Sequence, residues 1–98
     1  MYGTIATMRI DPANATKLAQ LLNDWNENEK PDNIGFVSGY MLQMDSDPST
    51  LKMVAIFKDE TSFRDNAASP EQDAWYQMMR ALLLDDPTWD DGKVIATP

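Results

Sequence analysis

The 98-residue sequence contains no cysteine and no histidine. Without cysteine, neither disulfides nor thiolate metal sites are available. Without histidine, the chain lacks the commonest general base, the commonest metal ligand and the usual haem ligand. Basic residues are also few, because eight Lys and Arg stand against sixteen Asp and Glu, which gives a formal net charge of -8. Such a charge repels phosphate backbones and anionic lipids, so nucleic acid and membrane partners are not expected.

Long apolar runs are missing as well. No stretch approaches the roughly 20 apolar residues that a membrane-spanning helix needs. The first ten residues lack a basic start followed by an apolar core, so we predict no secretory signal and expect a cytoplasmic protein. The length suits one hydrophobic core, and residues 1–98 are interpreted as a single domain.

The first half of the chain shows a strand, a helix and a hairpin. Alternation over residues 2–10 predicts a strand with Ala6, Met8 and Ile10 on one face. Asp11 followed by proline is a helix start, and an apolar stripe ending at Trp25 predicts a helix that stops at residues 30–33. The two apolar segments that come next are predicted to pair as a hairpin across a polar turn; they are 34–44 and 51–58.

The second half predicts another helix and a last strand. Residues 59–62 begin a helical region that is interrupted at Ser69, where Gln72, three residues on, predicts a capping box. Beyond this break an apolar stripe with helical spacing is expected to pack on the sheet, and it consists of Trp75, Met78, Met79 and Leu82. The acidic segment 85–92 is interpreted as a turn, and residues 93–97 as the last strand.

This order of elements is typical of the ferredoxin-like βαββαβ fold, an α+β class in which two helices cover one face of a four-stranded antiparallel sheet. A second apolar set is expected on the opposite face, consisting of Ile5, Val37, Met41, Val54, Ile56 and Val94. At about 25 cal/mol per Å², burying roughly 400 Å² of such surface would release about 10 kcal/mol of free energy. Monomers seldom leave an apolar patch of this size exposed. We therefore predict a homodimer that forms through the sheet faces.

Three segments carry a resemblance to a known family: ATMRIDPAN, the GF..GY segment at Gly35, Phe36, Gly39 and Tyr40, and FKDETSFRDNAASPEQDAW. Together they resemble the antibiotic biosynthesis monooxygenase domain family of the dimeric α+β barrel superfamily. The resemblance implies a dimeric α+β barrel with a pocket in each subunit, between the helices and the sheet. In several members that pocket takes a flat aromatic polyketide, a quinol or haem, and some members oxidise their substrate with O₂ and no cofactor.

The haem-degrading branch of this family is disfavoured by the residues themselves. Its Asn, Trp and His positions correspond here to Met8, Asn66 and Tyr76, and all three differ from the pattern. The chain also has no histidine to serve as an axial ligand. We therefore expect no haem, no other cofactor and no metal.

Two functions remain open from the sequence. One is a cofactor-independent monooxygenase acting on a small aromatic or quinol substrate, and the other is a non-catalytic homodimeric module that binds a small apolar or aromatic ligand. As catalytic candidates we name Tyr76, whose hydroxyl suits an oxyanion, and Asn66, whose amide suits a carbonyl. For Trp75 the interpretation as a core residue is favoured, because its partners in the stripe already explain it. The residues expected to bind the substrate are Met8, Tyr40, Met53, Trp75 and Met79.

Overall fold

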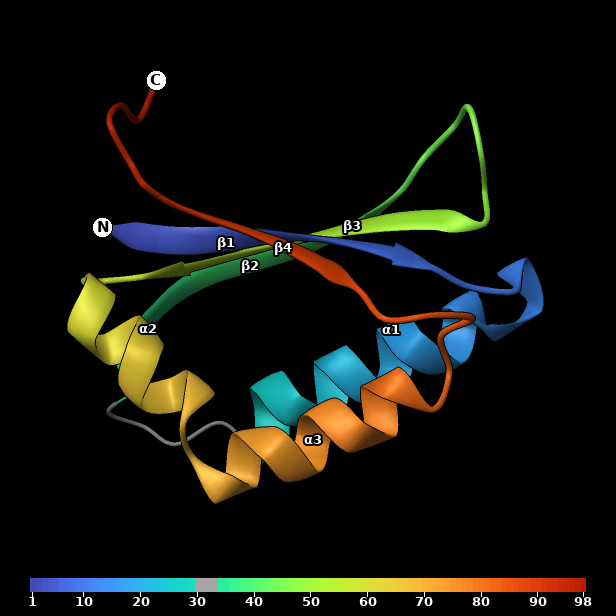
Figure 1. Ribbon diagram of the computed structural model, residues 1–98, viewed down its shortest axis with the longest axis horizontal. Helices are drawn as coiled ribbons and strands as arrows, with labels where there is room; N and C mark the ends of the chain where they lie inside the picture. The colour runs from blue at the N-terminus through green and yellow to red at the C-terminus, as the bar shows by residue number, and fades with distance from the viewer. Residues whose placement is uncertain (30–33) are drawn as a thin grey trace.

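The computed structural model describes residues 1–29 and 34–98. Its four strands form one antiparallel sheet in the order β2-β3-β1-β4, and the helices lie along one face of it (Figure 1). The strands are β1 (Tyr2–Arg9), β2 (Phe36–Gln43), β3 (Thr50–Phe57) and β4 (Thr88–Lys93). The helices are α1 (Ala15–Asp24), α2 (Glu60–Ala67) and α3 (Pro70–Arg80). The predicted α+β, ferredoxin-like fold is confirmed.

Strand β1 and helix α1 form as their residue patterns predict. Ala6, Met8 and Ile10 are buried at 1% exposure or less. At the turn that follows, the Asp11 carboxylate accepts a hydrogen bond from the Ala13 backbone N–H at 3.0 Å, so it caps the short 3₁₀ turn that leads into α1. Trp25 is buried at the far end of α1, and the predicted helix stop at 30–33 lies outside the described residues.

The break between α2 and α3 lies where the sequence predicts it. The Ser69 hydroxyl accepts a hydrogen bond from the Gln72 backbone N–H at 3.1 Å, and Pro70 begins the helix. Only half of the expected capping box forms, because the Ser69 N–H donates instead to the carbonyl of Asn66. Among the described residues, no helix has both the length and the apolar character to traverse a bilayer.

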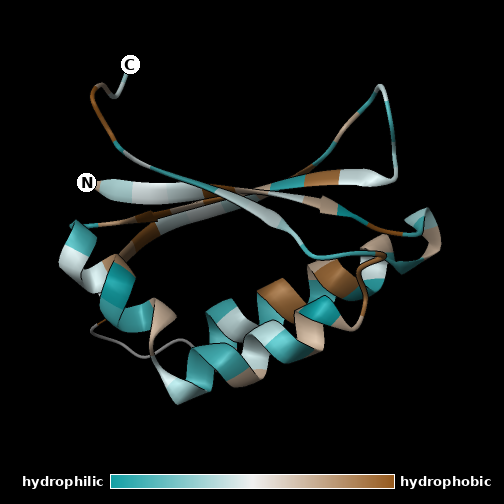
Figure 2. Cartoon of the chain, viewed as in Figure 1, coloured by the Kyte–Doolittle hydropathy of each residue, from teal (hydrophilic) through white to brown (hydrophobic). Residues whose placement is uncertain are grey.

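The sequence-based placement of the last strand is wrong. Residues 88–93 form β4, and the predicted strand at 93–97 lies almost wholly beyond its end. Every residue of β4 is exposed, and Figure 2 colours the strand hydrophilic to neutral. Strand β4 is an edge strand, where one side of the backbone has no partner and polar side chains are common, so its hydropathy lacks the apolar alternation of an inner strand.

Two positions face a different side from the predicted one. Met78 is 47% exposed, because the buried side of α3 is the one that carries Trp75 and Met79. Met41 pairs with the buried Met53 and therefore faces the helices rather than the opposite side. A register shift between residues 36 and 38 explains the second error, since one extra residue in a strand moves every later side chain to the other face.

The face of the sheet away from the helices is partly apolar. Ile5 is 45% exposed, Tyr40 66% and Leu42 50%. In the centre of this face Val54 pairs with both Ile5 and Tyr40 across neighbouring strands. In Figure 1 the helices of the described residues lie on the other side of the sheet.

Candidate functional site

A cavity of about 750 Å³ lies between the helices and the sheet. Aromatic residues make up much of its wall: all three tryptophans, all three phenylalanines and two of the three tyrosines. They are Trp25, Phe36, Tyr40, Phe57, Phe63, Trp75, Tyr76 and Trp89. Because these rings come from both the helices and the sheet, folding gathers nearly all of the aromatic surface of the chain around one hollow.

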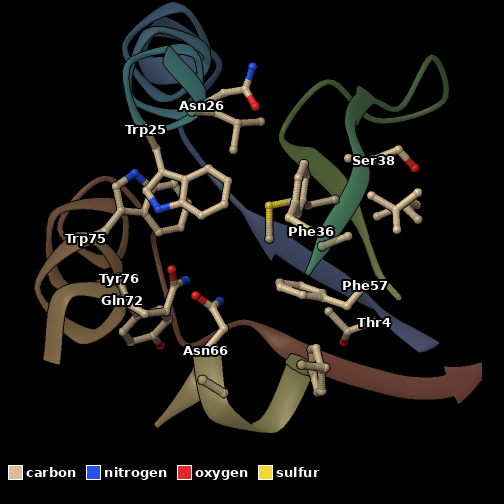
Figure 3. A pocket seen from close by; sticks show the side chains of 18 of the residues that line it. Thr4, Trp25, Asn26, Phe36, Ser38, Phe57, Asn66, Gln72, Trp75 and Tyr76 are labelled. Carbon is tan, nitrogen blue, oxygen red and sulfur yellow. The ribbon is translucent and has the colours of Figure 1, made fainter. Parts of the chain in front are cut away.

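The rings form a connected series rather than separate contacts. Trp25 stands between Trp75, with ring centroids 5.9 Å apart, and Phe36, at 5.4 Å and nearly perpendicular. The series continues through Phe57 to Phe63, in edge-on contacts of 5.6 Å each. Such edge-to-face packing holds each ring in one orientation. The wall is therefore built before any ligand arrives, and Figure 3 shows Trp25, Phe36 and Phe57 along it.

A polar corner interrupts this apolar wall. The amides of Asn66, on α2, and Gln72, on α3, point into the cavity and toward each other (Figure 3). The Gln72 Oε1 atom is buried, and it has no hydrogen-bond partner among the described residues. Tyr76 lies one turn further along α3, with its ring 6.2 Å from that of Trp89. Carboxamides both donate and accept hydrogen bonds, so this corner suits hydroxyl or carbonyl groups on a ligand.

Arg64 stands at the edge of the cavity and binds groups from two strands and its own helix. Its guanidinium donates to the Asp91 carboxylate at 3.2 Å and to the Tyr2 hydroxyl at 2.9 Å, and it lies 3.6 Å from Glu60. Partial desolvation lowers its pKa, but the hydrogen bond to Asp91 and the nearby acidic groups outweigh it, so the pKa of Arg64 is raised above its ordinary value. The Arg64 side chain is therefore permanently positively charged.

The structure brings most of the predicted site residues together. Asn66 and Tyr76 both line the cavity, as do Met53 and Trp75. Tyr40 also borders it, although its strand register points it away from the helices, so the cavity reaches the β2 edge of the sheet.

Two predicted binding residues lie elsewhere. Met8 and Met79 are almost completely buried, and neither lines the cavity. Both belong to the core cluster that also contains Met53 and Trp75, so they pack behind the wall. Among the described residues, no group of three His, Cys, Asp or Glu side chains is arranged to hold a metal ion.

Several wall residues did not stand out as site residues in the sequence. Trp25 was explained as part of a helix stripe, and Trp89 lay in a segment interpreted as a turn. Gln72 was assigned only a capping role. The one available signal was the number of aromatic residues in a short chain, which indicates a pocket or a core without separating the two.

Comparisons with known proteins show the fold class and no more. No known protein-family pattern matches the sequence, and no curated protein matches it in sequence. Many solved structures match in shape, and their names repeatedly refer to antibiotic biosynthesis monooxygenases, so the chain has the ferredoxin-like α+β fold of those proteins.

Three of these neighbours illustrate the likeness. A protein from Caulobacter crescentus, provisionally named an antibiotic biosynthesis monooxygenase, has a TM-score of 0.81 at 14% identity, covering 97% of this chain and 90% of its own. A variant of SnoaB, a cofactor-independent oxygenase from Streptomyces nogalater, has a TM-score of 0.74 at 17% identity, covering 98% and 94%. A conserved protein from Methanosarcina mazei Go1 has a TM-score of 0.78 at 17% identity, covering 94% and 90%.

Proposed function

We propose that the chain is a cofactor-independent monooxygenase that oxidises a small aromatic or quinol molecule inside this cavity. The observation that carries the proposal is the gathering of eight of the nine aromatic residues around one hollow with a polar corner. Its volume of about 750 Å³ falls in the usual range for small-molecule sites. The likeness in fold to a protein named as a cofactor-independent oxygenase supports the same assignment.

Each predicted residue has a role in this proposal. The substrate hydroxyl releases its proton to solvent water, and the Tyr76 hydroxyl donates a hydrogen bond to the oxyanion that forms. The Asn66 amide orients the substrate oxygen. Trp75 and Met53 contact the flat faces and edges of the ring system. Tyr40 borders the opening at the β2 edge, while Met8 and Met79 hold the wall from behind.

The overall chemistry balances without a cofactor, because the substrate supplies all the electrons. A phenol ring carbon gains one oxygen atom from O₂ to become a quinone carbonyl, and the second oxygen atom leaves as water with two hydrogens from the substrate. For 1,5-dihydroxynaphthalene the products are 5-hydroxy-1,4-naphthoquinone and water. The chain holds the ring and stabilises the oxyanion.

The experiment that tests this proposal uses 1,5-dihydroxynaphthalene as substrate, an oxygen electrode and mass spectrometry of the product under ¹⁸O₂. The wild-type chain is expected to consume O₂ and to place one labelled oxygen in the quinone. Tyr76→Phe removes one oxyanion donor and is expected to slow turnover about 100-fold. Gln77→Ala, on the exposed side of the same helix, is the matched control and should keep the wild-type rate. Oxygen uptake no faster than the buffer blank, with the substrate bound, refutes the oxygenase.

Substrate binding without O₂ uptake is the result expected for the alternative function, a non-catalytic module that binds a small molecule. One observation favours this alternative. Among the described residues, the ionisable side chains that line the cavity are Tyr40, Arg64, Asp73, Tyr76 and Asp91. None of these types has an ordinary pKa near 7, where a general base works best. Binding of the dihydroxynaphthalene, measured by calorimetry without O₂ uptake, would assign the module instead of the enzyme.

The proposal includes a homodimer formed through the sheet faces. Ile5, Tyr40 and Leu42 are each 45% exposed or more on the side that the helices leave bare, and Val54 lies between them. Monomers seldom leave a continuous apolar surface of this kind in water. Sedimentation equilibrium is expected to give twice the chain mass of 11.1 kDa. Ile5→Asp, which places a charge in this face, is expected to shift the mass toward that of one chain; a wild-type monomer at micromolar concentration refutes the dimer.

A further inference from the structure

We propose that the cavity selects an uncharged aromatic ligand over an anionic one, and that Asp91 enforces the choice by occupying the guanidinium of Arg64. This inference rests on the proposed function, because it names the charge class of the ligand that the same cavity takes. It concerns a pair of residues to which the oxidation itself assigns no part.

The charges around the cavity are unevenly divided. Among the described residues that line it, Arg64 is the one basic side chain, and Asp73 and Asp91 are acidic. Glu60, one helical turn before Arg64, adds a further carboxylate at 3.6 Å from the guanidinium. Two of these carboxylates, Glu60 and Asp91, lie against the one cation, and Asp73 adds a further negative charge to the wall, in a chain whose formal net charge is -8. A ligand that arrives as an anion beside Arg64 meets an unfavourable potential. The oxyanion of the proposed reaction, by contrast, forms only after the uncharged substrate has bound, and the Tyr76 hydroxyl stabilises it.

The cation that could offset this potential is already bound on several sides. One terminal nitrogen of Arg64 donates to Asp91 at 3.2 Å, and the other donates to the Tyr2 hydroxyl at 2.9 Å. The guanidinium also lies over the rings of Tyr2 and Phe63, at 5.5 and 5.2 Å from their centroids. A ligand carboxylate would have to displace Asp91 before it reached the forked donors that suit it.

Asp91 comes from a different part of the fold than the cation it holds. It lies on β4, opposite Thr4 of β1 and on the face toward the helices, whereas Arg64 lies on α2. Its side chain is 30% exposed and borders the cavity, so it is the more enclosed member of the pair. Asp91→Asn keeps the shape and one acceptor oxygen, and it removes the competing charge from the guanidinium.

Uncharged oxygen groups meet no such barrier. The amides of Asn66 and Gln72 point into the cavity, and amides bind a phenol or a ketone without needing a counter-ion (Figure 3). A carboxylate pressed against the aromatic wall, by contrast, loses water and gains no free cation. The cavity therefore combines neutral hydrogen-bonding groups with an arginine whose charge is already paired with carboxylates.

The test compares 2-naphthol with 2-naphthoate by isothermal titration calorimetry at about pH 7, where phenols are uncharged and carboxylic acids are ionised. The wild-type chain is expected to bind the naphthol at least about tenfold more tightly than the naphthoate, the scale of one charge-assisted hydrogen bond. Asp91→Asn is expected to strengthen naphthoate binding about tenfold and to change naphthol binding less than about twofold. The ratio of two affinities on one variant does not depend on the fraction of folded protein.

Two charge controls separate this mechanism from a general change in net charge. Asp73→Asn removes a carboxylate from the cavity wall that is not paired with Arg64, and Asp65→Asn removes one from the exposed side of α2. Both are expected to change naphthoate binding much less than Asp91→Asn does. The double variant Arg64→Gln/Asp91→Asn is expected to lose the gain, because the receptor for the carboxylate is gone.

The outcomes distinguish a failure of the charge selectivity from a failure of the proposed function. If the wild-type chain binds neither compound, the proposed function fails, and the selectivity fails with it. If it binds both equally tightly, or if Asp65→Asn matches the gain of Asp91→Asn, only the present inference is overturned. A gain that survives in the double variant also overturns it.

Discussion

The adjacent methionines of α3 provide a matched pair of substitutions. Met79 is completely buried, in a cluster with Trp75 and Leu83, whereas Met78 is 47% exposed. Met79→Ala removes three heavy atoms from a closed site and is expected to destabilise the protein by about 3 kcal/mol, from the lost transfer energy and the cavity left behind. Met78→Ala makes the same chemical change at the surface and is expected to cost about 0.5 kcal/mol.

Thermal unfolding followed by circular dichroism measures the difference. For a domain of this size, 3 kcal/mol corresponds to a fall in Tm of about 12 to 24 °C, against a few degrees for the surface variant. Both variants and the wild type are compared at one protein concentration, because the stability of an oligomer depends on it. Urea unfolding should show a lower midpoint with an unchanged slope.

Equal losses for the two variants, or a larger loss for Met78→Ala, would refute the orientation of α3. The consequence reaches the candidate site, because Tyr76 lies three residues before Met79 on the same helix. A rotation of α3 that buried Met78 would also turn Tyr76 to a different direction. The stability measurement thus tests the wall of the cavity without any ligand.

Three further outcomes are expected. Ser69→Ala removes the side-chain cap of α3 and should lower the free energy of unfolding by about 1 kcal/mol in urea titrations. Gly35→Ala should lower the free energy of unfolding by about 2 kcal/mol or more, because Gly35 has φ of +80° and a new Cβ would lie 2.7 Å from the Ser62 side chain. Gly92→Ala is the control: its new Cβ meets no atom within 4 Å, so the free energy of unfolding should not change in the same assay. The hydrogen bonds from the Ser62 N–H and hydroxyl hold the pKa of Asp59 below its ordinary 3.8. The stability that these bonds add is therefore present above about pH 4 and is lost as the pH falls through the pKa of the folded state. In Asp59→Asn the urea midpoint should fall less steeply over the same pH range.

The order of the elements could be predicted because local chemistry marks their ends. Asp11 and Ser69 cap helices at the positions where the sequence places caps, and the alternation of β1 survives in its burial pattern. Strand β4 could not be predicted, because an exposed edge strand needs no apolar alternation. The face of Met41 was missed because the register shift after Phe36 depends on pairing with another strand, which no local pattern records.

Some residues of the candidate site could also be predicted from the sequence, and others could not. Asn66 and Tyr76 were named for their chemistry, and the structure places both at the cavity. Trp25 and Trp89 were not named, because whether a tryptophan faces a cavity or a core depends on which elements meet across it. The pairing of Arg64 with Asp91 joins residues 27 positions apart on different elements, and only the folded chain brings them together.

The convergence of the three tryptophans on one hollow has a practical result. Trp25, Trp75 and Trp89 are the only indoles in the chain, and each borders the cavity. Their fluorescence therefore comes entirely from the surroundings of the site, with no distant emitter to dilute the signal. A flat compound that enters will quench or shift that emission, so occupancy can be followed in solution without a dye, a label or an engineered probe.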